Sequence, residues 1–462
     1  MMEFGLIGEH LGHSFSKEIH GRLSDRPYEL REIPRDALAK FLTSSEFKGI
    51  NVTIPYKEAV LPLLDFVSPE ARQIGAVNTI VNRDGRLFGY NTDYFGFSAL
   101  ADRLGIDFKG KRVLILGAGG AAKTVAAVAA DRSAASVTHA VRRPKAPGQI
   151  PLSSLGSESS YKDVIPGPKG VIPGWTGDLV VNCTPAGMFP HEEERIIDLG
   201  ALPQLEGAID LIYNPLRTDL ILDALSRGVP AEGGLYMLVA QAVKAREYFD
   251  GIPGPAGDDS LRAGDDSLRT GNDTLRVGDD SLGSVMAGSD RPSPDDVFDA
   301  LLKAKRNIVL IGMPASGKST IGKALSEKTG RPFADTDSLI VQKAGKPIPQ
   351  IFAEEGEAAF RALESDVIRE LSPRTGLVIA TGGGAVLDPQ NVRRLSRNGL
   401  LCFIRRDPER LQATADRPLS SSREAMQALY ESRREAYRRA TERVIDNNGS
   451  LEEALSQFNA LI

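Results

Sequence analysis

Short apolar runs alternate with segments of helical character on both sides of a polar stretch near residue 270. Two of these runs, Arg112–Leu116 and Asn307–Ile311, have the length and composition of buried strands, and each leads directly into a glycine-rich turn. The segments that follow, Ala121 to Ala130 and Ser319 onward, have helical composition. Strand, turn and helix in this order predict an α/β fold with parallel sheets on both sides of the polar stretch.

Two weaker patterns extend this prediction. Residues 136–141 follow the first predicted helix and have the composition of its next strand. Arg361 and Glu364 are spaced to lie together on a polar face of a helix, where they are available for polar contacts. Four apolar residues predict the buried face of that helix: Phe360, Leu363, Val367 and Leu371.

The polar stretch contains a tandem heptapeptide from Gly257 to Ser284, which reads GDDSLRA, GDDSLRT, GNDTLRV, GDDSLGS. Each unit offers one leucine, too little apolar surface to offset the entropy lost on ordering. A coiled coil would need a second apolar position in each heptad, and a calcium-binding β-roll would need a nonapeptide pattern. We therefore expect a flexible acidic linker over residues 251–294, between two parts that each have the size of one or two domains.

Composition narrows the function classes. The chain has 462 residues, of which 41% are hydrophobic and 25% charged, so ordinary globular cores are expected. A net charge of -5 argues against nucleic acid as the main partner. Cys183 and Cys402 are the two cysteines, which suits a reducing cytoplasm. Neither a secretory signal nor an apolar run of the roughly 18 residues needed to span a bilayer is visible, so we expect a cytoplasmic protein without a membrane partner.

The first glycine-rich turn, at 117–122, has the spacing that accommodates a dinucleotide pyrophosphate. Gly117 permits the tight turn, and Gly119 lets the pyrophosphate approach the backbone. The start of the helix, at Gly120 and Ala121, then directs N–H groups toward the phosphates. The alternative is a glycine-rich turn without a ligand.

The end of the following strand bears on the choice of cofactor. Enzymes that use NAD usually carry an acid there for the ribose hydroxyls, whereas this chain has Arg142 and Arg143. Two guanidinium groups suit the 2′-phosphate of NADP. A solvated basic turn is the alternative interpretation.

The second turn reads GxxxxGKS, the pattern of a loop that binds a nucleoside triphosphate. Lys318 is expected to reach the β and γ oxygens and Ser319 to bind Mg²⁺. Asp335 and Asp337 follow; at a strand end they would point the same way, one toward Mg²⁺ and the other toward an attacking hydroxyl. On its own, Asp-x-Asp is more often a turn. The predicted nucleotide-binding residues of the loop are Gly312, Ala315, Ser316, Gly317, Lys318, Ser319 and Thr320.

Polar motifs also precede the first glycine turn. Lys57 is a candidate to donate a proton to an oxygen that becomes an alkoxide as hydride arrives, with Asp93 orienting it. Taken alone, Lys57 is more often a surface lysine and Asp93 a turn residue.

The motifs of the first part together resemble shikimate dehydrogenase, from the N-terminus to about Tyr248. They are His13 to Ser16, Asn51 to Lys57, Asn78-Thr79, Asn91 to Asp93, Asn182 to Met188, Asp210 to Pro215 and Gly234 to Ala242. The resemblance implies that Lys57 and Asp93 are the catalytic pair and that Gly234 lies at the cofactor. It also implies a set of substrate contacts: Ser14, Ser16, Thr53, Asn78, Tyr213 and Gln241. Lys17 departs from the proline of many relatives, and of the family's Asn-Arg-Thr only Arg142 carries over.

The second part, from about Lys303 to Ile462, resembles shikimate kinase. The motifs in family order are the glycine loop, Phe333 to Asp337, Phe360-Arg361, Gly382 to Gly384, Arg417 to Leu419, and Arg433 with Tyr437. The resemblance implies that Arg417 reaches the transferred phosphoryl group from a mobile lid. It implies the following shikimate contacts: Asp337, Arg361, Gly383, Gly384 and Arg433. Ala315 departs from a glycine common in this loop, and Ser420 to Ser422 make the lid unusually polar.

The two resemblances imply a bifunctional enzyme that reduces 3-dehydroshikimate to shikimate with NADPH and then phosphorylates shikimate with ATP and Mg²⁺. They imply a two-lobed dehydrogenase with a Rossmann-type NADP lobe, the linker and a P-loop parallel α/β kinase. The expected boundaries are 1–103 with 235–250 for the substrate lobe, 104–234 for the NADP lobe and 303–462 for the kinase. A quinate dehydrogenase that uses NAD is one alternative. A catalytically dead, metabolite-sensing regulator is another, but Lys57, Asp93, Lys318 and Asp337 are all present and no basic DNA-binding element is visible.

Overall fold

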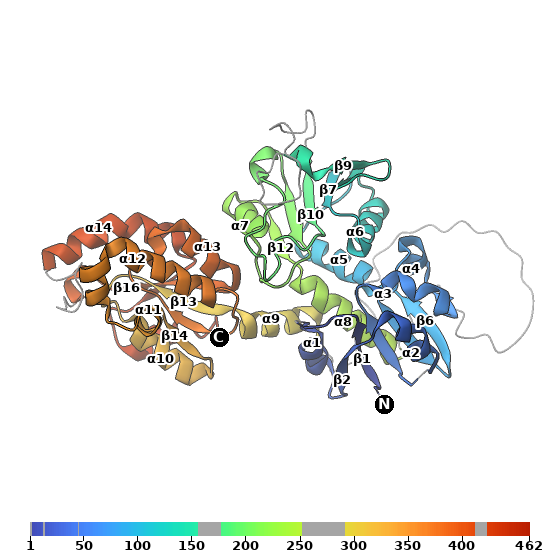
Figure 1. Ribbon diagram of the computed structural model, residues 1–462, viewed down its shortest axis with the longest axis horizontal. Coiled ribbons are helices and arrows are strands. Elements are labelled where there is room, and N and C mark those ends of the chain that lie inside the picture. Colours follow the sequence, from blue (N-terminus) through green and yellow to red (C-terminus); the bar gives the residue numbers. More distant parts are fainter. Residues whose placement is uncertain (1, 13, 45, 156–176, 252–291, 412–422) are drawn as a thin grey trace, which may run out of the picture. The chain divides into compact units, whose positions relative to one another are not determined.

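The computed structural model describes residues 2–12, 14–44, 46–155, 177–251, 292–411 and 423–462 (Figure 1). These residues form three sheets and fall into two compact units. The first unit comprises Met1–Arg103, Lys123–Val128 and Tyr236–Phe298; the second comprises Leu104–Ala122, Ala129–Leu235 and Asp299–Ile462. The heptapeptides, Arg417 and Ser420 to Ser422 lie outside the described residues. The boundaries of the four predicted segments stay predictions.

The first unit is built on a mixed sheet of six strands in the order β2-β1-β3-β5-β6-β4. β1 pairs in parallel with β2 and β3, and β5 runs antiparallel to β3 and β6. The strands are β1 (Phe4–Gly8), β2 (Tyr28–Glu32), β3 (Gly49–Val52), β4 (Phe66–Val67), β5 (Thr79–Arg83) and β6 (Arg86–Tyr90). The helices are α1 (Ser16–Leu23), α2 (Leu38–Ser44), α3 (Tyr56–Ala59), α4 (Pro69–Ile74), α5 (Thr92–Arg103) and most of α8 (Leu235–Phe249).

Helix α8 completes the core of the first unit although it is distant in sequence. Its residues Ala245, Tyr248 and Phe249 share one buried cluster with Phe4 of β1 and Tyr90 of β6. The rings of Tyr90 and Tyr248 stack with centroids 4.0 Å apart. Aromatic burial of this kind contributes stability through both area and ring geometry, so it holds α8 against the sheet.

The second unit contains a fully parallel sheet in the order β12-β11-β10-β7-β8-β9. Its strands are β7 (Arg112–Leu116), β8 (Ser136–Val141), β9 (Gln149–Pro151), β10 (Leu179–Asn182), β11 (Gly207–Asp210) and β12 (Ala231–Gly233). The helices beside it are α7 (Asp219–Ser226) and the two ends of α6 (Gly120–Asp131), whose residues 123–128 are assigned to the first unit. From β7 the chain proceeds to β8 and β9 on one side, and from β10 to β11 and β12 on the other. The point where the order reverses, between β7 and β10, is where dinucleotides bind to such sheets.

A second parallel sheet in the same unit has the order β14-β15-β13-β16-β17. Its strands are β13 (Asn307–Ile311), β14 (Phe333–Asp335), β15 (Val378–Ala380), β16 (Gly399–Arg405) and β17 (Arg443–Asp446). The helices are α9 (Pro294–Lys305), α10 (Lys318–Thr329), α11 (Thr336–Ala344), α12 (Ile348–Leu371), α13 (Pro389–Asn398), α14 (Arg423–Ala440) and α15 (Leu451–Ser456).

The central strand β13 shows how this sheet divides the core. Val309 and Ile311 belong to the cluster formed with α11, α12, α13 and α14, whereas Ile308 and Leu310 belong to the cluster formed with α10 and α15. Successive side chains of a strand point to opposite faces, so a continuous apolar run is needed where both faces are covered. This is why β13 reads as NIVLI without alternation.

The predicted strands at 112–116, 136–141 and 307–311 are confirmed, as is the α/β class. The predicted helical face is confirmed for Phe360, Val367 and Leu371, which are buried, whereas Leu363 is partly buried and packs against the same cluster. Helix α12 is interrupted at Gly356, whose φ of 83° breaks the helical ladder. The residues after this break carry Arg361 and Glu364, so the kink sets the direction of the segment that bears them.

Helix α9 begins within the first unit. Asp295 pairs with Arg103 and accepts a hydrogen bond from the hydroxyl of Tyr236 at 3.3 Å. The Arg103 guanidinium lies 4.7 Å from the ring centroids of both Tyr236 and Phe298. Since the end of α8 belongs to the same unit, the chain between α8 and α9 leaves from and returns to one body.

Deletion of Gly257 to Ser284 is therefore expected to leave the turnover numbers of both predicted activities within about twofold of the wild-type values, because loop length changes closure entropy only slowly. Steady-state assays of the purified deletion variant would check this. Loss of either activity in a folded variant would show that the repeats have a role beyond connection.

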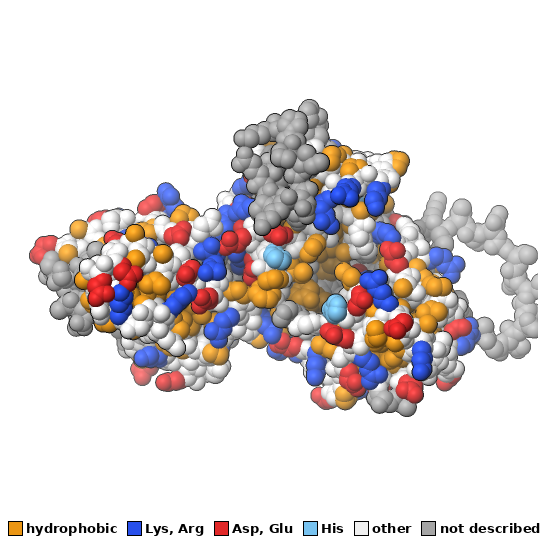
Figure 2. Space-filling model, viewed as in Figure 1, with side chains coloured by type: hydrophobic (Ala, Val, Ile, Leu, Met, Phe, Trp, Pro, Cys, Tyr) orange, Lys and Arg blue, Asp and Glu red, His pale blue; other side chains and the backbone are white. Residues whose placement is uncertain are grey.

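No helix among the described residues combines the length and the apolar character required to cross a bilayer. On the face seen in Figure 2, Lys and Arg side chains are interspersed with Asp and Glu side chains. This distribution agrees with the small net charge of -5.

Candidate active sites

Lys57 and Asp93 form an ion pair in the first unit. Lys57 lies on the short helix α3 after β3, and Asp93 lies in the first turn of α5. Lys57 Nζ and Asp93 Oδ2 are 2.5 Å apart, and the two side chains are 21% and 13% exposed. The structure thus brings the predicted pair together, with both side chains partly exposed to solvent.

A chain of polar contacts fixes the side chains beside this pair. The backbone N–H of Thr92 donates to Asn78 Oδ1 at 2.7 Å, and its hydroxyl donates to Gln241 Oε1 at 3.1 Å. Asn51 Nδ2 donates to Thr79 Oγ1 at 3.0 Å. The neighbouring segments around residues 78 and 92 therefore meet Gln241, which is 149 residues beyond Thr92, in one buried network that includes both Asn78 and Gln241.

The other predicted substrate contacts are placed separately. Ser14 Oγ donates to Ser16 Oγ at 3.0 Å where α1 begins. Thr53 follows β3 and is half-buried, and its backbone N–H donates to Ile7 O at 2.9 Å. Tyr213 belongs to the second unit, where burial raises the pKa of its phenol.

The first glycine turn has room for a diphosphate. Gly117 has a φ of 112°, a region that favours glycine, and its N–H donates to Ala140 O at 2.8 Å. A Cβ atom added at Gly119 or Gly120 would meet no atom within 4 Å. Ala121 follows in the first turn of α6. Open space before a helix N-terminus is the arrangement that binds phosphate, so these residues fit the pyrophosphate of a dinucleotide.

Arg142 and Arg143 follow directly after β8, and both are exposed. β8 is the parallel neighbour of β7, so the two arginines lie at the sheet edge from which the glycine turn emerges. Gly234 lies after β12, where its N–H donates to Ile212 O at 2.8 Å and a Cβ atom would collide with Leu211 O. This close approach explains why glycine is required at position 234.

The second glycine turn wraps around the side chain of Lys318. Lys318 Nζ donates to Gly312 O at 2.9 Å and to Met313 O at 2.8 Å. Gly312 and Gly317 have φ values of 147° and 95°. Ser316 is buried, whereas Ser319 and Thr320 are exposed. The Lys318 ammonium group therefore lies beside the backbone of the loop, whose N–H groups would bind the phosphates, and this arrangement is the one that an ATP site requires.

The expectation that Asp335 and Asp337 point the same way is wrong. β14 ends at Asp335, which is the N-cap of α11 and accepts hydrogen bonds from Asp337 N at 3.0 Å and Ser338 N at 3.3 Å. Its other oxygen accepts from Ser319 Oγ at 2.6 Å. The chain turns into a helix here because an N-cap carboxylate satisfies the first free N–H groups. Asp335 and Ser319, the two predicted metal ligands, are thus side by side.

Asp337 points instead toward a cluster of charged residues at Gly382. A Cβ atom added at Gly382 would lie 2.8 Å from Asp337 Oδ1 and 2.6 Å from Glu364 Oε1. Arg361 Nη1 donates to Glu364 Oε2 at 2.8 Å. The Arg361 guanidinium also lies so near Gly384 that a Cβ atom there would collide with it. Carboxylates and guanidinium groups therefore converge on one glycine-lined surface.

Arg433 and Tyr437 complete the cluster from helix α14. Arg433 is 5% exposed, and the Tyr437 hydroxyl donates to Gly383 O at 2.5 Å. Burial raises the pKa of Tyr437 to about 12, and the charge of Arg433 acts in the opposite direction. The same glycine segment is close to the nucleotide loop, because a Cβ atom at Gly383 would lie 2.8 Å from Pro314 Cδ.

Comparison with known proteins identifies the family of the N-terminal part. A family model described as shikimate dehydrogenase substrate binding domain matches residues 6–80. A curated protein of Clostridium perfringens, named shikimate dehydrogenase (NADP(+)), is 37% identical over 266 residues, which cover 54% of this chain and 93% of the relative. A protein of the same name from Geobacillus sp. is 40% identical over 219 residues, which cover 47% of this chain and 78% of the relative. The chain belongs to the shikimate dehydrogenase family.

The C-terminal part has its own match. A family model described as shikimate kinase matches residues 314–462.

Among solved structures, a chorismate mutase/shikimate 5-dehydrogenase fusion protein from Clostridium acetobutylicum is 35% identical, covers 55% of this chain and 91% of that one, and has a TM-score of 0.49. The family models at residues 6–80 and 314–462, together with the curated relatives, show that the chain joins a dehydrogenase and a kinase of the shikimate pathway in one polypeptide, as the sequence predicts. NADP(H), ATP and Mg²⁺ are the cofactors that the two families imply.

One residue of the charged cluster at Gly382 was not among the predicted site residues. Glu364 is 1% exposed, and its Oε1 has no hydrogen-bond partner among the described residues. Burial raises its pKa, while Arg361 opposes the shift. The spacing of three residues from Arg361 predicted their shared face but not the contact with Gly382, which depends on the fold. Thr79 and Thr92, which contact Asn78, lie within the motifs of the first part, but no role was predicted for either.

Ala315 in the nucleotide loop of the kinase has a φ of 61°, a left-handed conformation that costs an alanine about 1–2 kcal/mol. Ala315→Gly is expected to raise the free energy of unfolding of the kinase by about 0.5–1 kcal/mol, because relief of strain exceeds the added entropy of the unfolded chain. Denaturant titration of the full chain would measure this. Ala324→Gly, inside α10, is the matched control and should lower stability by about 0.5–1 kcal/mol. Equal effects of both substitutions would contradict the prediction.

Proposed function

We propose that the dehydrogenase part reduces 3-dehydroshikimate to shikimate with NADPH and that the kinase part then phosphorylates the 3-hydroxyl of shikimate with ATP. The observation that carries the first half is the 2.5 Å contact between Lys57 and Asp93 beside the network of Asn78 and Gln241. The two reactions are consecutive, since the hydroxyl that the first creates is the one that the second uses. That relation gives a reason for joining them in one chain.

In the dehydrogenase, Lys57 would donate a proton to the carbonyl oxygen as it becomes an alkoxide, and Asp93 would hold the ammonium group in place. Ser14, Ser16, Thr53, Asn78, Tyr213 and Gln241 are the proposed contacts for the substrate carboxylate and hydroxyls. Hydroxyl and amide groups already fixed by neighbours lose little entropy when a substrate binds, which favours specificity for a polyhydroxylated ring.

In the kinase, Asp337 would orient the 3-hydroxyl of shikimate and accept its proton. Arg361 and Arg433 would hold the substrate carboxylate, for which guanidinium forks are suited, against Gly383 and Gly384. Glu364 would keep Arg361 in position through their 2.8 Å hydrogen bond. Lys318 and the loop backbone would hold the phosphates, and Ser319 with Asp335 would hold Mg²⁺ directly or through water. Arg417 remains the proposed lid residue. When bound, NADPH supplies the hydride and ATP the phosphoryl group.

The test is a single incubation of the full chain with 3-dehydroshikimate, NADPH, ATP and Mg²⁺. Loss of absorbance at the NADPH band should accompany formation of shikimate 3-phosphate, identified by mass spectrometry. Omission of ATP should stop the reaction at shikimate. Preferential oxidation of quinate with NAD, and no reduction of 3-dehydroshikimate, would instead identify the alternative dehydrogenase.

Replacing both Arg142 and Arg143 with glutamine is expected to raise the KM for NADPH at least about tenfold and to change the KM for NADH little. A charge-assisted hydrogen bond contributes roughly 1.5–3 kcal/mol, and only NADPH offers the 2′-phosphate. Lys109→Gln, an exposed charge of the same unit, is the control for net charge. Equal increases for both cofactors would show that these arginines do not bind the 2′-phosphate.

A further inference from the structure

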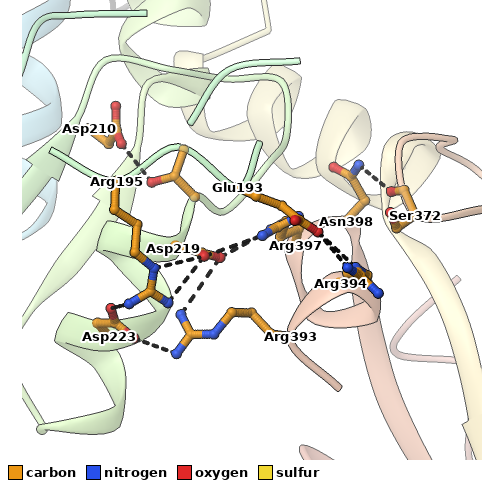
Figure 3. A network of polar contacts seen from close by, with 11 residues as sticks. Glu193, Arg195, Asp210, Asp219, Asp223, Ser372, Arg393, Arg394, Arg397 and Asn398 are labelled. Atoms are coloured by element: carbon orange, nitrogen blue, oxygen red, sulfur yellow. Dashed lines mark hydrogen bonds and ion pairs between the residues drawn. The ribbon is translucent and has the colours of Figure 1, made fainter. Parts of the chain in front are cut away.

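Helix α13 of the kinase carries three arginines whose partners all lie in the NADP lobe (Figure 3). Arg397 donates to both carboxylate oxygens of Asp219, through Nε at 3.0 Å and Nη2 at 3.2 Å. Arg393 Nη2 donates to Asp223 Oδ1 at 2.6 Å, and Arg394 Nε donates to Glu193 Oε1 at 2.8 Å. Asp219 and Asp223 are both on α7, so two acids of one helix meet two arginines of another.

The pair of Asp219 and Arg397 is buried. Their side chains are only 5% and 4% exposed, although both residue types are normally at the surface. Asp219 also accepts from the guanidinium of Arg195, at 3.3 and 3.2 Å, and this arginine reaches Asp223 as well. Burial of such charges is tolerated where the geometry is bidentate and the remaining oxygens have partners, which is the case here.

A second set of contacts between the NADP lobe and the kinase involves backbone N–H groups. The N–H of Leu216 donates to Asn398 Oδ1 at 2.9 Å, and the N–H of Arg217 donates to Arg397 O at 2.9 Å. The Arg217 guanidinium donates to both oxygens of Glu442, at 2.8 and 3.1 Å, and to Gly399 O. The charge pattern is therefore of both signs: acids of the NADP lobe meet kinase arginines, and an arginine of the NADP lobe meets a kinase glutamate.

We propose that this surface, formed by α7 with Leu216 and Arg217 on one side and by α13 with Glu442 on the other, docks the kinase onto the NADP lobe of the same chain in solution. Complementary charges of mixed sign select one partner and one register, because a shifted or inverted arrangement brings like charges together. The kinase and the NADP lobe, both in the second unit, then form one body joined by a specific interface.

Hydrogen exchange of the full chain tests the proposal at the amides of Leu216 and Arg217, whose acceptors belong to the kinase. Residue-resolved mass spectrometry should find both amides protected in the wild-type protein. Glu442→Arg, a kinase substitution, is expected to raise their exchange rates by roughly tenfold or more, while the amides of β13 stay protected. The double variant Arg217→Glu with Glu442→Arg should recover part of the protection.

The exposed Glu354 gives the matched control, because its partners Lys346 and Gln350 are both kinase residues, so Glu354→Arg alters charge on the kinase without changing a contact of this surface. This control variant should leave the exchange rates of the Leu216 and Arg217 amides unchanged. If these two amides exchange in the wild-type protein at the rate of an unprotected peptide, the proposal is wrong, whatever the variants do. Protection that declines when the protein is diluted tenfold would also overturn it, since the kinase of a second copy would then be the partner.

Discussion

Lys57→Ala is expected to lower the turnover number of the dehydrogenase by about 10²–10⁴-fold, the usual contribution of a positioned general acid. The basis is the contact of 2.5 Å between Lys57 Nζ and Asp93 Oδ2, in a position that is still 21% exposed on the lysine side. Kinase turnover should stay near the wild-type value, because Lys57 lies in the first unit and the nucleotide loop of the kinase in the second. Stopped-flow and steady-state assays of both reactions on one protein sample would measure the two effects together.

Lys48→Ala is the control for this substitution. Lys48 also pairs with an acid at 2.6 Å, Glu3, but the two side chains are 69% and 39% exposed and lie away from the predicted substrate contacts. Loss of this surface pair should leave turnover unchanged. If the two alanine variants behaved alike, or if Lys57→Ala changed only the KM, Lys57 would have no role as the proton donor.

Asp337→Asn is expected to lower kinase turnover by about 10²–10⁴-fold, since the amide keeps the shape of the side chain but cannot accept the proton of the attacking hydroxyl. Asp337 reaches the same glycine surface as Glu364, and Arg361 and Arg433 neutralise part of the charge there. The affinity for ATP should change little, because Lys318 and the loop backbone are untouched. Dehydrogenase turnover should remain at the wild-type value.

Asp366→Asn provides the comparison. Asp366 lies on α12 and forms an ion pair with Arg369 on the helix surface at 2.8 Å, so Asp366→Asn should leave kinase turnover nearly unchanged. A variant Asp337→Asn that raised the KM for shikimate tenfold at unchanged turnover would assign Asp337 to binding alone. The same result for both variants would remove Asp337 from the reaction.

The parts of the fold that the sequence predicts best are those where one local signal suffices. β7 and β13 end where they were expected to end because each apolar run meets a glycine that needs a positive φ, at Gly117 and Gly312. The direction of Asp337 was not predictable in the same way. Whether the strand continues or a helix begins after Asp335 depends on the capping bonds that its carboxylate makes, and these compete with strand geometry over two residues.

The candidate sites show the same limit. Lys57 and Asp93 could be paired from the sequence because the resemblance names both, whereas Glu364 acquires its place only when β15 brings Gly382 beside it. Asp219 and Arg397 carry no sequence signal at all. They are 178 residues apart, and each has the character of an ordinary surface charge until the two helices meet.

The attachment of α9 to Arg103 and Tyr236 also bears on how many heptapeptide repeats the fold can accept. The described residues on either side of the array, Phe249 of α8 and Asp295 of α9, belong to the same unit, so an added or deleted repeat changes only the length of the chain between two fixed points. Doubling such a loop costs about 0.6 kcal/mol in closure entropy. The number of repeats is therefore close to neutral for the stability of the fold.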